Sequence, residues 1–332
     1  MTVGIAILGA GRIGQVHAQA VSQAAEARLV AVYDPFDEAA DTVIQKHGCD
    51  RRSVEEIAAA DDVQAVAICT PTDLHADQIE FFARAGKAVF CEKPIDLSVP
   101  RVRNCLKVVR ETGATLMVGF NRRFDPDFKA LKSSIDNGSV GSVEMITITS
   151  RDPGPPPIEY IERSGGIFRD MTIHDFDIAR WLLDDPVETV SAQGSVLVDA
   201  AIGDAGDFDS ANVILRTRNG RQCVITNSRR AVYGYDQRIE VHGSDGMVQA
   251  QNTHEARVEV ASASGFKRPP LQNFFMERYT AAYAAEIAAF VEAVNTREEP
   301  PTTGEDGLAA LVLAEAAHRS ATEGRTVLVD EI

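Results

Sequence analysis

Basic residues are scarce in this chain. Lysine and arginine together number 33 against 49 aspartates and glutamates, which gives a formal net charge of −16 over 332 residues. Nucleic acids and anionic membranes both select basic protein surfaces. The composition therefore argues against nucleic acid and membrane lipid as partners.

Long apolar runs and paired cysteines are also missing. No apolar stretch approaches the roughly 20 residues of a membrane helix, and the chain enters a strand pattern at Val3 where a signal peptide would still be apolar and helical. Five cysteines form no C-x-x-C pair and no zinc spacing, which favours reduced thiols in a reducing compartment. We therefore expect a cytoplasmic protein. The cysteines are Cys49, Cys69, Cys91, Cys105 and Cys223.

The first 120 residues alternate apolar strands with amphipathic helices, a pattern typical of a parallel α/β sheet. We predict strands at 3–8, 28–33, 63–69, 88–91 and 115–119. Helices are expected near 13–26, 37–47, 54–59, 75–85 and 99–112. The length suits two domains, and the first is predicted to be a doubly wound Rossmann domain over residues 1–121.

After residue 140 the strands come in series. They are predicted at 143–149, 187–198, 210–217, 221–227, 238–242, 246–250, 256–261 and 325–329. Asn219-Gly220 and Asp245-Gly246 are hairpin signals between neighbouring strands, so these should pair antiparallel. Helices are expected to open at Asp125-Pro126 and to lie near 172–183, 278–295 and 304–322. Residues 122–332 are thus predicted to form an α+β domain with an open, mainly antiparallel sheet.

A glycine-rich loop follows the first strand. Gly9-Ala10-Gly11-Arg12-Ile13-Gly14 opens the first helix, and Asp34 lies twenty residues beyond Gly14 at the end of the second strand. This context is that of a dinucleotide-binding loop, in which the helix N-terminus binds the diphosphate. Asp34 can accept both ribose hydroxyls of NAD and would repel a 2′-phosphate. Arg12 could favour NADP, but Asp34 faces the 2′ position more directly, so NAD is the expected cofactor.

Polar residues gather after the carboxyl ends of the other strands, where open α/β sheets bind ligands. Thr70, Pro71 and His75 follow one strand, Glu92-Lys93-Pro94 follows the next, and Arg122 and Arg123 follow the last. The residues expected to contact the cofactor are Gly9, Gly11, Arg12, Ile13, Gly14, Asp34, Thr70, Pro71, His75, Glu92 and Lys93.

With Gly165-Gly166-Ile167-Phe168-Arg169-Asp170-Met171-Thr172-Ile173-His174-Asp175, these motifs resemble the Gfo/Idh/MocA oxidoreductases in order and spacing over essentially the whole chain. The later Tyr233-Gly234-Tyr235-Asp236 is similar to the branch of bacterial inositol 2-dehydrogenases. The resemblance implies that Lys93, Asp170 and His174 are the catalytic trio. It also implies a homo-oligomer, a tetramer or dimer, built through the open sheet.

Chemistry gives the trio the same roles. Oxidation of a secondary alcohol needs a base for the hydroxyl proton, and histidine is suited to this near neutral pH. Asp170, His174 and Asp177 are spaced i, i+4, i+7 and should share one helix face. Asp170 would orient the ring or hold a neighbouring hydroxyl, and Lys93 would stabilise the developing negative oxygen.

Other interpretations stay open. Lys93 could be a solvated lysine at a strand end, and the Asp170 group could be a polar face or a metal site, although His242 and His254 offer no supporting ligand spacing. Arg122 and Arg123 could form surface ion pairs, and Tyr233 and Tyr235, on one strand face, could be packing residues. The expected substrate contacts are Arg123, Asp170, His174, Asp177, Tyr233 and Tyr235, with no metal.

The function expected from these features is NAD-dependent oxidation of a secondary alcohol on a cyclic polyol, with myo-inositol converted to 2-keto-myo-inositol (scyllo-inosose). A dehydrogenase of another sugar or cyclitol would use the same trio. A redox-silent NAD-binding regulator is the alternative from a different class, although such relatives can lose the catalytic residues that are present here. A relative that uses NAD transiently to cleave glycosides is not excluded by the motifs.

Overall fold

The computed structural model describes residues 2–332 and consists of two compact units. Unit 1 is formed by the residues up to Phe124 together with Ala281–Leu311, and unit 2 by Asp125–Thr280 and Val312–Ile332. The single boundary predicted at 121/122 assigns 281–311 to the second domain, whereas these residues pack in unit 1. Two ring contacts hold these residues in unit 1. The ring centroids of Phe290 and Phe90 are 5.8 Å apart, and those of Tyr283 and His17 are 5.5 Å apart.

Unit 1 contains a six-stranded sheet in the order β3-β2-β1-β4-β5-β6, with every pair parallel. This is the Rossmann strand order, and its switch point lies between β1 and β4. Every residue of β1 and β4 is buried, as expected for central strands covered on both faces. The strands are β1 (Val3–Leu8), β2 (Ala27–Tyr33), β3 (Asp50–Arg51), β4 (Ala65–Ile68), β5 (Ala88–Glu92) and β6 (Leu116–Gly119).

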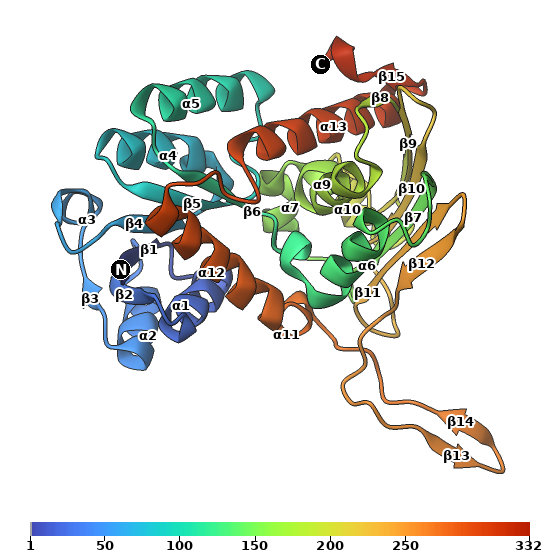
Figure 1. Cartoon of the computed structure of the whole chain (residues 1–332), viewed down its shortest axis with the longest axis horizontal. Coiled ribbons are helices and arrows are strands. Elements are labelled where there is room, and N and C mark those ends of the chain that lie inside the picture. The colour runs from blue at the N-terminus through green and yellow to red at the C-terminus, as the bar shows by residue number, and fades with distance from the viewer. Residues whose placement is uncertain (1) are drawn as a thin grey trace. The chain divides into compact units, whose positions relative to one another are not determined.

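Helices cover both faces of this sheet, with α1 and α2 on one side and α4 and α5 on the other (Figure 1). Their ends follow local rules: Ser53 and Glu56 form a capping box at the start of α3, and Gly48 and Gly113 end α2 and α5 in the left-handed conformation. The helices are α1 (Arg12–Gln23), α2 (Asp37–His47), α3 (Val54–Ala59), η1 (Thr72–Leu74), α4 (His75–Arg84), α5 (Val99–Thr112), η2 (Asn121–Phe124) and α12 (Thr280–Thr296).

Unit 2 contains a seven-stranded sheet in the order β12-β11-β7-β10-β9-β8-β15. Both predicted hairpins are confirmed, since β9 pairs antiparallel with β10 and β11 with β12. One neighbouring pair, β7 and β10, is parallel, so the sheet is mixed and mostly antiparallel. The strands are β7 (Val143–Arg151), β8 (Val187–Ser195), β9 (Ser210–Thr217), β10 (Gln222–Ser228), β11 (Asp236–Gly243), β12 (Gly246–Ala250) and β15 (Val327–Leu328).

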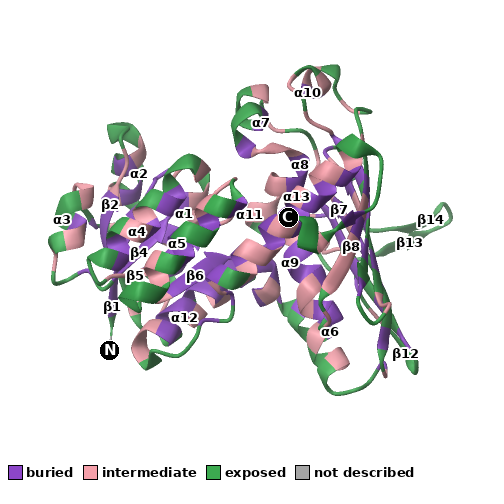
Figure 2. Cartoon of the chain, turned by 90° about the horizontal axis from the view of Figure 1, so that it is seen from above, coloured by how far each residue is buried: buried purple, intermediate pink, exposed green. Residues whose placement is uncertain are grey.

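Within the described part of unit 2, helices lie against one face of this sheet and none covers the other face (Figure 2). A separate two-stranded hairpin, β13 (Val260–Ser262) with β14 (Gly265–Lys267), projects away from the sheet on its uncovered side. The helices are α6 (Pro126–Asp136), α7 (Ile158–Ser164), α8 (Gly166–Asp170), α9 (Thr172–Leu183), α10 (Ala200–Asp204), α11 (Phe275–Arg278), α13 (Gly304–Glu323), which begins in unit 1, and η3 (Val329–Glu331).

Three strand predictions in this unit are wrong in their extent, and one of them, the strand expected at 325–329, is limited to Val327–Leu328. The strand expected at 187–198 ends at Ser195, because the buried Asp209 carboxylate accepts hydrogen bonds from the backbone N–H groups of residues 197–199 at 2.7–3.1 Å. These donors are therefore withdrawn from the sheet. The strand expected at 256–261 is present only from Val260 and belongs to the projecting hairpin.

Candidate active site

Two glycines of the loop in unit 1, Gly9 and Gly14, have no room for a side chain, whereas Gly11 has open space beside it. Gly9 has a φ of +91°, and a Cβ on it would meet the Cys69 carbonyl oxygen at 2.6 Å. A Cβ on Gly14 would meet the Gly9 carbonyl oxygen at 1.9 Å, so the helix and the loop pack without room for a side chain. A Cβ on Gly11 would meet no atom of the described chain within 4 Å. The loop therefore leaves space at the position where a diphosphate would approach the backbone.

Asp34 is held in place by the loop that it faces. Its Oδ2 accepts a hydrogen bond from the Ala10 N–H at 2.6 Å, and its Oδ1 accepts one from the Phe36 N–H at 2.8 Å. Each carboxylate oxygen has two acceptor positions, so a second one remains on each oxygen for ribose hydroxyls. Among residues 2–332 no side chain caps the N-terminus of α1, and no acidic side chain occupies its first turn. These features fit an NAD diphosphate and adenosine ribose.

His75 connects the loops that follow β4 and β5. Its Nδ1 lies 2.8 Å from the Pro94 carbonyl oxygen, and its Nε2 lies 2.7 Å from the Thr70 carbonyl oxygen. Burial lowers the pKa of His75, although both carbonyl contacts favour the charged ring. A buried side chain that bridges two backbone carbonyls holds the loops together. The structure thus shows a positioning role for His75, and its contact with the cofactor stays a prediction.

Lys93 lies between two residues that each contact a buried histidine. On its carboxyl side is Pro94, held by His75; on its amino side is Glu92, whose Oε1 lies 2.6 Å from Nε2 of the fully buried His17. The Lys93 N–H donates to the other Glu92 oxygen at 3.3 Å. Nδ1 of His17 has no hydrogen-bond partner within the described residues.

The thiols near this site are buried and inert. Cys91 is fully buried, and its burial raises the pKa of the thiol well above the ordinary value. A nucleophilic cysteine needs a lowered pKa and access to solvent. Cys91 is therefore a packing residue of β5.

In unit 2, Asp170 ends the short helix α8 and is fixed by two side chains. Its Oδ1 accepts a hydrogen bond from the Tyr160 hydroxyl at 2.8 Å, and its Oδ2 lies 3.5 Å from Nη1 of Arg229. Arg229 is 1% exposed and also lies 3.4 Å from Asp207. The buried guanidinium of Arg229 therefore lies between the carboxylates of Asp170 and Asp207. Met171, with φ −95° and ψ −58°, separates α8 from α9.

The predicted single helix face for the Asp170 group is therefore wrong. Asp170 belongs to α8, whereas His174 and Asp177 belong to α9. His174 is half-buried, but Asp175 and Asp177 are fully buried. Asn227 of β10 fixes the start of α9, because it accepts a hydrogen bond from Thr172 at 2.7 Å and donates to Asp175 at 2.8 Å. Of these residues, His174 is the one with an accessible side chain near Asp170 in sequence.

Arg123 has contacts inside unit 1. Its Nη2 lies 3.0 Å from Asp306, and its Nη1 donates to the Pro301 carbonyl oxygen at 3.2 Å. Burial raises the pKa of Asp306, but Arg123 and hydrogen bonds from Thr303 outweigh it, so the pKa lies below its ordinary value. Arg123 therefore forms an ion pair that is largely buried and not on the surface, and its contact with the substrate stays a prediction.

Tyr233 and Tyr235 do not share a strand face, because both precede β11. Tyr233 is 47% exposed, donates its hydroxyl to Asp236 at 2.6 Å and accepts a hydrogen bond from Arg151 at 2.9 Å. Burial and the contact with Asp236 raise the pKa of Tyr233. Tyr235 is buried, with its ring 6.0 Å from that of Tyr279.

Comparison with known proteins agrees with this geometry. Residues 3–120 match the model of the oxidoreductase family with an NAD-binding Rossmann fold, and residues 128–249 match that of a GFO/IDH/MocA C-terminal domain. The chain is 61% identical over 329 residues to the inositol 2-dehydrogenase of Rhizobium meliloti (strain 1021), covering 99% of this chain and 100% of the relative.

The chain belongs to the Gfo/Idh/MocA oxidoreductase family.

Two solved structures of relatives have the same fold. The myo-inositol dehydrogenase of Corynebacterium glutamicum ATCC 13032 is 42% identical with a TM-score of 0.95, and the match covers 99% of each chain. The scyllo-inositol dehydrogenase of Lactobacillus casei, with bound NAD(H) and scyllo-inositol, is 28% identical with a TM-score of 0.92, covering 99% of this chain and 100% of that one. The cofactor of this Gfo/Idh/MocA protein is therefore NAD, bound by its Rossmann domain.

No group of three or more histidine, cysteine, aspartate or glutamate side chains in residues 2–332 is arranged to hold a metal ion. No helix in the same residues has both the length and the apolar character needed to cross a membrane.

The sequence patterns did not predict His17, which contacts Glu92 in unit 1, or Arg229, which contacts Asp170 in unit 2. His17 lies on the buried stripe of α1 with Gly14, Ala18 and Val21, and a histidine within such a stripe was the signal available. Arg229 continues the alternation of buried residues along β10, which places it inside.

Proposed function

We propose that this protein oxidises a secondary alcohol of a cyclic polyol with NAD, and that its substrate is myo-inositol, converted to 2-keto-myo-inositol (scyllo-inosose). The observation that carries the proposal is the 61% identity over the full chain to a protein named inositol 2-dehydrogenase. The presence of Lys93, Asp170 and His174 supports a dehydrogenase over a redox-silent NAD-binding regulator.

NAD, when bound, accepts the hydride that leaves the alcohol carbon. The glycine loop would receive its diphosphate at Gly11, and Asp34 would accept hydrogen bonds from the ribose hydroxyls. The open space at Gly11 and the fixed orientation of Asp34 support these two assignments. Further contacts are assigned to Thr70, Pro71 and Glu92 at the strand ends.

His174 is proposed as the base that takes the hydroxyl proton, and Asp170 as the carboxylate that orients substrate or imidazole. The anchoring of Asp170 by Tyr160 and Arg229 supports a fixed position for this carboxylate. Lys93 would stabilise the negative charge that develops on the oxygen. The anchoring of its neighbours by His17 and His75 supports a rigid site for the ammonium group.

The burial of the predicted residues narrows the set that we propose for contacts with the substrate. Arg123 is paired with Asp306, Asp177 is fully buried, and Tyr235 packs on Tyr279. Asp170, His174 and the half-exposed Tyr233 are therefore the residues that we propose for hydroxyl contacts.

The test is a panel of cyclitols and aldoses assayed with NAD and with NADP, following the absorbance of the reduced cofactor. We expect kcat/KM to be highest for myo-inositol with NAD, and one reduced cofactor to form for each substrate consumed. Higher kcat/KM with scyllo-inositol or an aldose would change the substrate within the same chemistry. Absence of reduced cofactor with every compound would refute the dehydrogenase and favour a regulator.

We further propose that the protein is a cytoplasmic homo-oligomer, a tetramer or dimer. Five free cysteines, all buried, support a reducing compartment. Exposed apolar side chains on the uncovered face of the unit 2 sheet support association through that face. They are Met145, Ile214, Val224 and Met247, which are 36–51% exposed.

A further inference from the structure

Gly165 and Gly166 begin the motif that contains Asp170, and both have backbone conformations that favour glycine. Their φ angles are +83° and +82°. A Cβ on Gly166 would meet Oδ1 of Asp207 at 2.6 Å. The same Oδ1 accepts a hydrogen bond from the Ile167 N–H at 2.9 Å. Asp207 therefore holds the start of α8, and Gly166 leaves the space for its carboxylate.

Asp207 is fixed by the segment between α10 and β9. Its N–H donates to the Ile202 carbonyl oxygen at 3.1 Å. The ring of the next residue, Phe208, has its centroid 6.2 Å from that of the buried Phe168 of α8. The segment and α8 are thus attached to each other in two places, at the Ile167 N–H and at the Phe168 ring.

The end of α8 is connected to the same aspartate through Arg229, which is 1% exposed. Its Nη1 lies 3.5 Å from Oδ2 of Asp170, and its Nη2 lies 3.4 Å from Oδ2 of Asp207. Both distances exceed the roughly 2.7–2.9 Å of a charge-assisted hydrogen bond. Each carboxylate therefore prevents the guanidinium from closing on the other.

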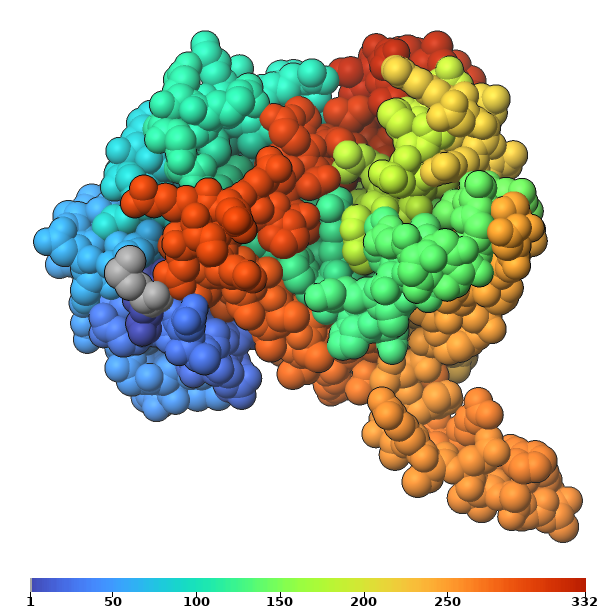
Figure 3. Space-filling model, viewed as in Figure 1, coloured from blue at the N-terminus to red at the C-terminus, as the bar shows by residue number. Residues whose placement is uncertain are grey.

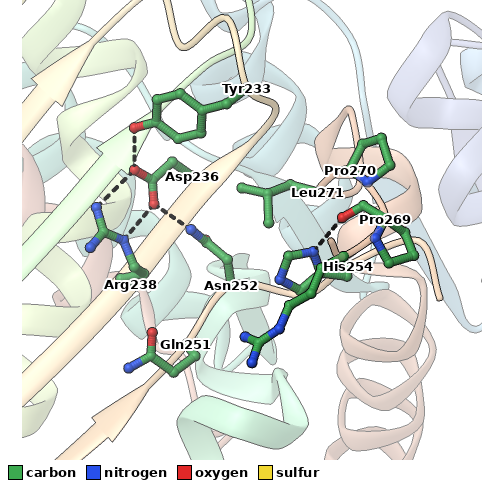
Figure 4. A pocket seen from close by; sticks show the side chains of 10 residues that line it. Tyr233, Asp236, Arg238, Gln251, Asn252, His254, Pro269, Pro270 and Leu271 are labelled. Atoms are coloured by element: carbon green, nitrogen blue, oxygen red, sulfur yellow. Dashed lines mark hydrogen bonds and ion pairs between the residues drawn. The ribbon is translucent and has the colours of Figure 1, made fainter. Parts of the chain in front are cut away.

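Another buried carboxylate of unit 2 shows the geometry of an unshared pair. The β13–β14 hairpin stands clear of the surrounding surface (Figure 3), and Asp236 of β11 binds the base of this segment at Asn252. Asp236 is fully buried and accepts hydrogen bonds from Tyr233 and Asn252, each at 2.6 Å, and from Arg238 at 2.7 and 2.9 Å (Figure 4). One arginine there closes on one carboxylate. Arg229 stays farther from each of two carboxylates, which indicates that it is shared between them.

We propose that Asp207 is a positioning residue that holds the Asp170 carboxylate where the oxidation of the substrate needs it. Asp207 acts through the Ile167 N–H at the start of α8 and through Arg229 at its end. The inference rests on the role proposed above for Asp170. A buried cation requires compensation, so Arg229 would close on Asp170 if Asp207 lost its charge. The guanidinium would then draw the Asp170 carboxylate away from the Tyr160 hydroxyl, which donates to it at 2.8 Å.

The substitution Asp207→Asn isolates this effect. Asparagine keeps the oxygen that accepts from Ile167 and turns an NH₂ group toward Arg229. We expect the formation of reduced cofactor from myo-inositol and NAD, in single turnovers with enzyme in excess, to slow by about ten- to a hundredfold, because a misplacement of about 1 Å can cost a hundredfold. The NAD dissociation constant from calorimetry should be unchanged, because the NAD-binding domain lies in unit 1 and Asp207 in unit 2.

Asp125→Asn is the matched control in the same unit. Asp125 is 1% exposed, accepts hydrogen bonds from the N–H groups of Asp127 and Phe128 at 3.1 and 3.2 Å, and pairs with the buried Arg278. The control therefore makes the same change in a different buried aspartate–arginine pair, at the start of α6. It should lower the melting temperature and leave the single-turnover rate unchanged.

The decisive measurement repeats Asp207→Asn in a chain that already carries Asp170→Asn. If Asp207 acts through Asp170, the second substitution should change the single-turnover rate by less than about twofold, because the two effects are not additive. A loss by the same factor in both backgrounds would show a general structural role and overturn the inference, as would a wild-type rate for Asp207→Asn alone. Either result would leave the dehydrogenase in place. A wild type that formed no reduced cofactor with any polyol would overturn both.

Discussion

Asp34 offers the sharpest test of the cofactor site, through the substitution Asp34→Asn. In the structure the carboxylate accepts two backbone N–H groups, from Ala10 and Phe36. Asparagine keeps one acceptor oxygen and turns an NH₂ group toward one of these donors. The Phe36 bond is exposed to water and the Ala10 bond is partly buried, so the NH₂ group should face Phe36. The loss is then at the low end of the 1–3 kcal/mol range, about 1 kcal/mol of unfolding free energy.

The cofactor should respond more strongly than the fold. A charge-assisted hydrogen bond contributes about 1.5–3 kcal/mol, so Asp34→Asn should weaken NAD binding by about ten- to a hundredfold. NADP should gain relative to NAD, because the charge that repels its 2′-phosphate is removed. The preference of the wild type for NAD, expected to be at least about tenfold, should therefore shrink.

Titration calorimetry with both cofactors, kcat/KM with both, and urea unfolding measure these three effects separately. Asp61→Asn is the matched control, because it removes the same charge from an exposed turn of unit 1. If Asp34→Asn lowered the affinities for NAD and NADP by the same factor, Asp34 would serve only to hold the glycine loop. Equal efficiency of the wild type with both cofactors would refute the assignment altogether.

Three further predictions concern the reacting groups and one ion pair. Lys93→Ala should lower turnover by about two to three orders of magnitude and leave the NAD dissociation constant from calorimetry nearly unchanged; abolished NAD binding would make Lys93 a cofactor ligand instead. His174→Ala should remove most of the turnover and the inflection of the pH–rate profile, in which the rate rises as the imidazole deprotonates. If the variant kept both the turnover and the inflection, a group other than His174 would be the base. Asp306→Asn should flatten the loss of stability in acid, because the lowered pKa of Asp306 gives stability that is present above the ordinary pKa and lost as pH falls through the folded value, below about pH 4. Urea midpoints of this variant and the wild type at pH 7 and pH 3 measure this, and equal losses would contradict the role of the Arg123 pair.

The sequence was most informative where local rules decide the structure. The helices expected at 37–47, 54–59, 99–112 and 172–183 have the predicted bounds. Their caps and their apolar spacing are local properties of a few residues. The parallel pairing of β7 with β10 is not local, because β8, β9 and several helices lie between them in the chain. The hairpin signals at two turns predict only the pairing of strands that are adjacent in sequence, so they do not predict this pair.

Errors in local structure arose where a distant side chain competes for the backbone. Leu197 and Val198 have the composition of a strand, but the Asp209 carboxylate accepts hydrogen bonds from their N–H groups. The i, i+4, i+7 spacing of the Asp170 group assumed one continuous helix, and Met171 divides it. The first effect cannot be seen in residues 197 and 198 themselves, because the competing carboxylate lies elsewhere in the chain.

Arg229 shows how the same periodicity can find a functional residue. Cys223, Ile225 and Asn227 are the buried positions of β10, and the two-residue period continues to Arg229. A charged residue on the inward side of a strand requires a carboxylate partner. Asp170 and Asp207 provide it at 3.5 and 3.4 Å. An inward arginine thus predicts a buried acid, and its partner Asp170 is the residue that the motif already marked as catalytic. A polar residue at an inward strand position can therefore be matched to a carboxylate in a motif. Such a match would have connected Arg229 with Asp170 before the fold was known.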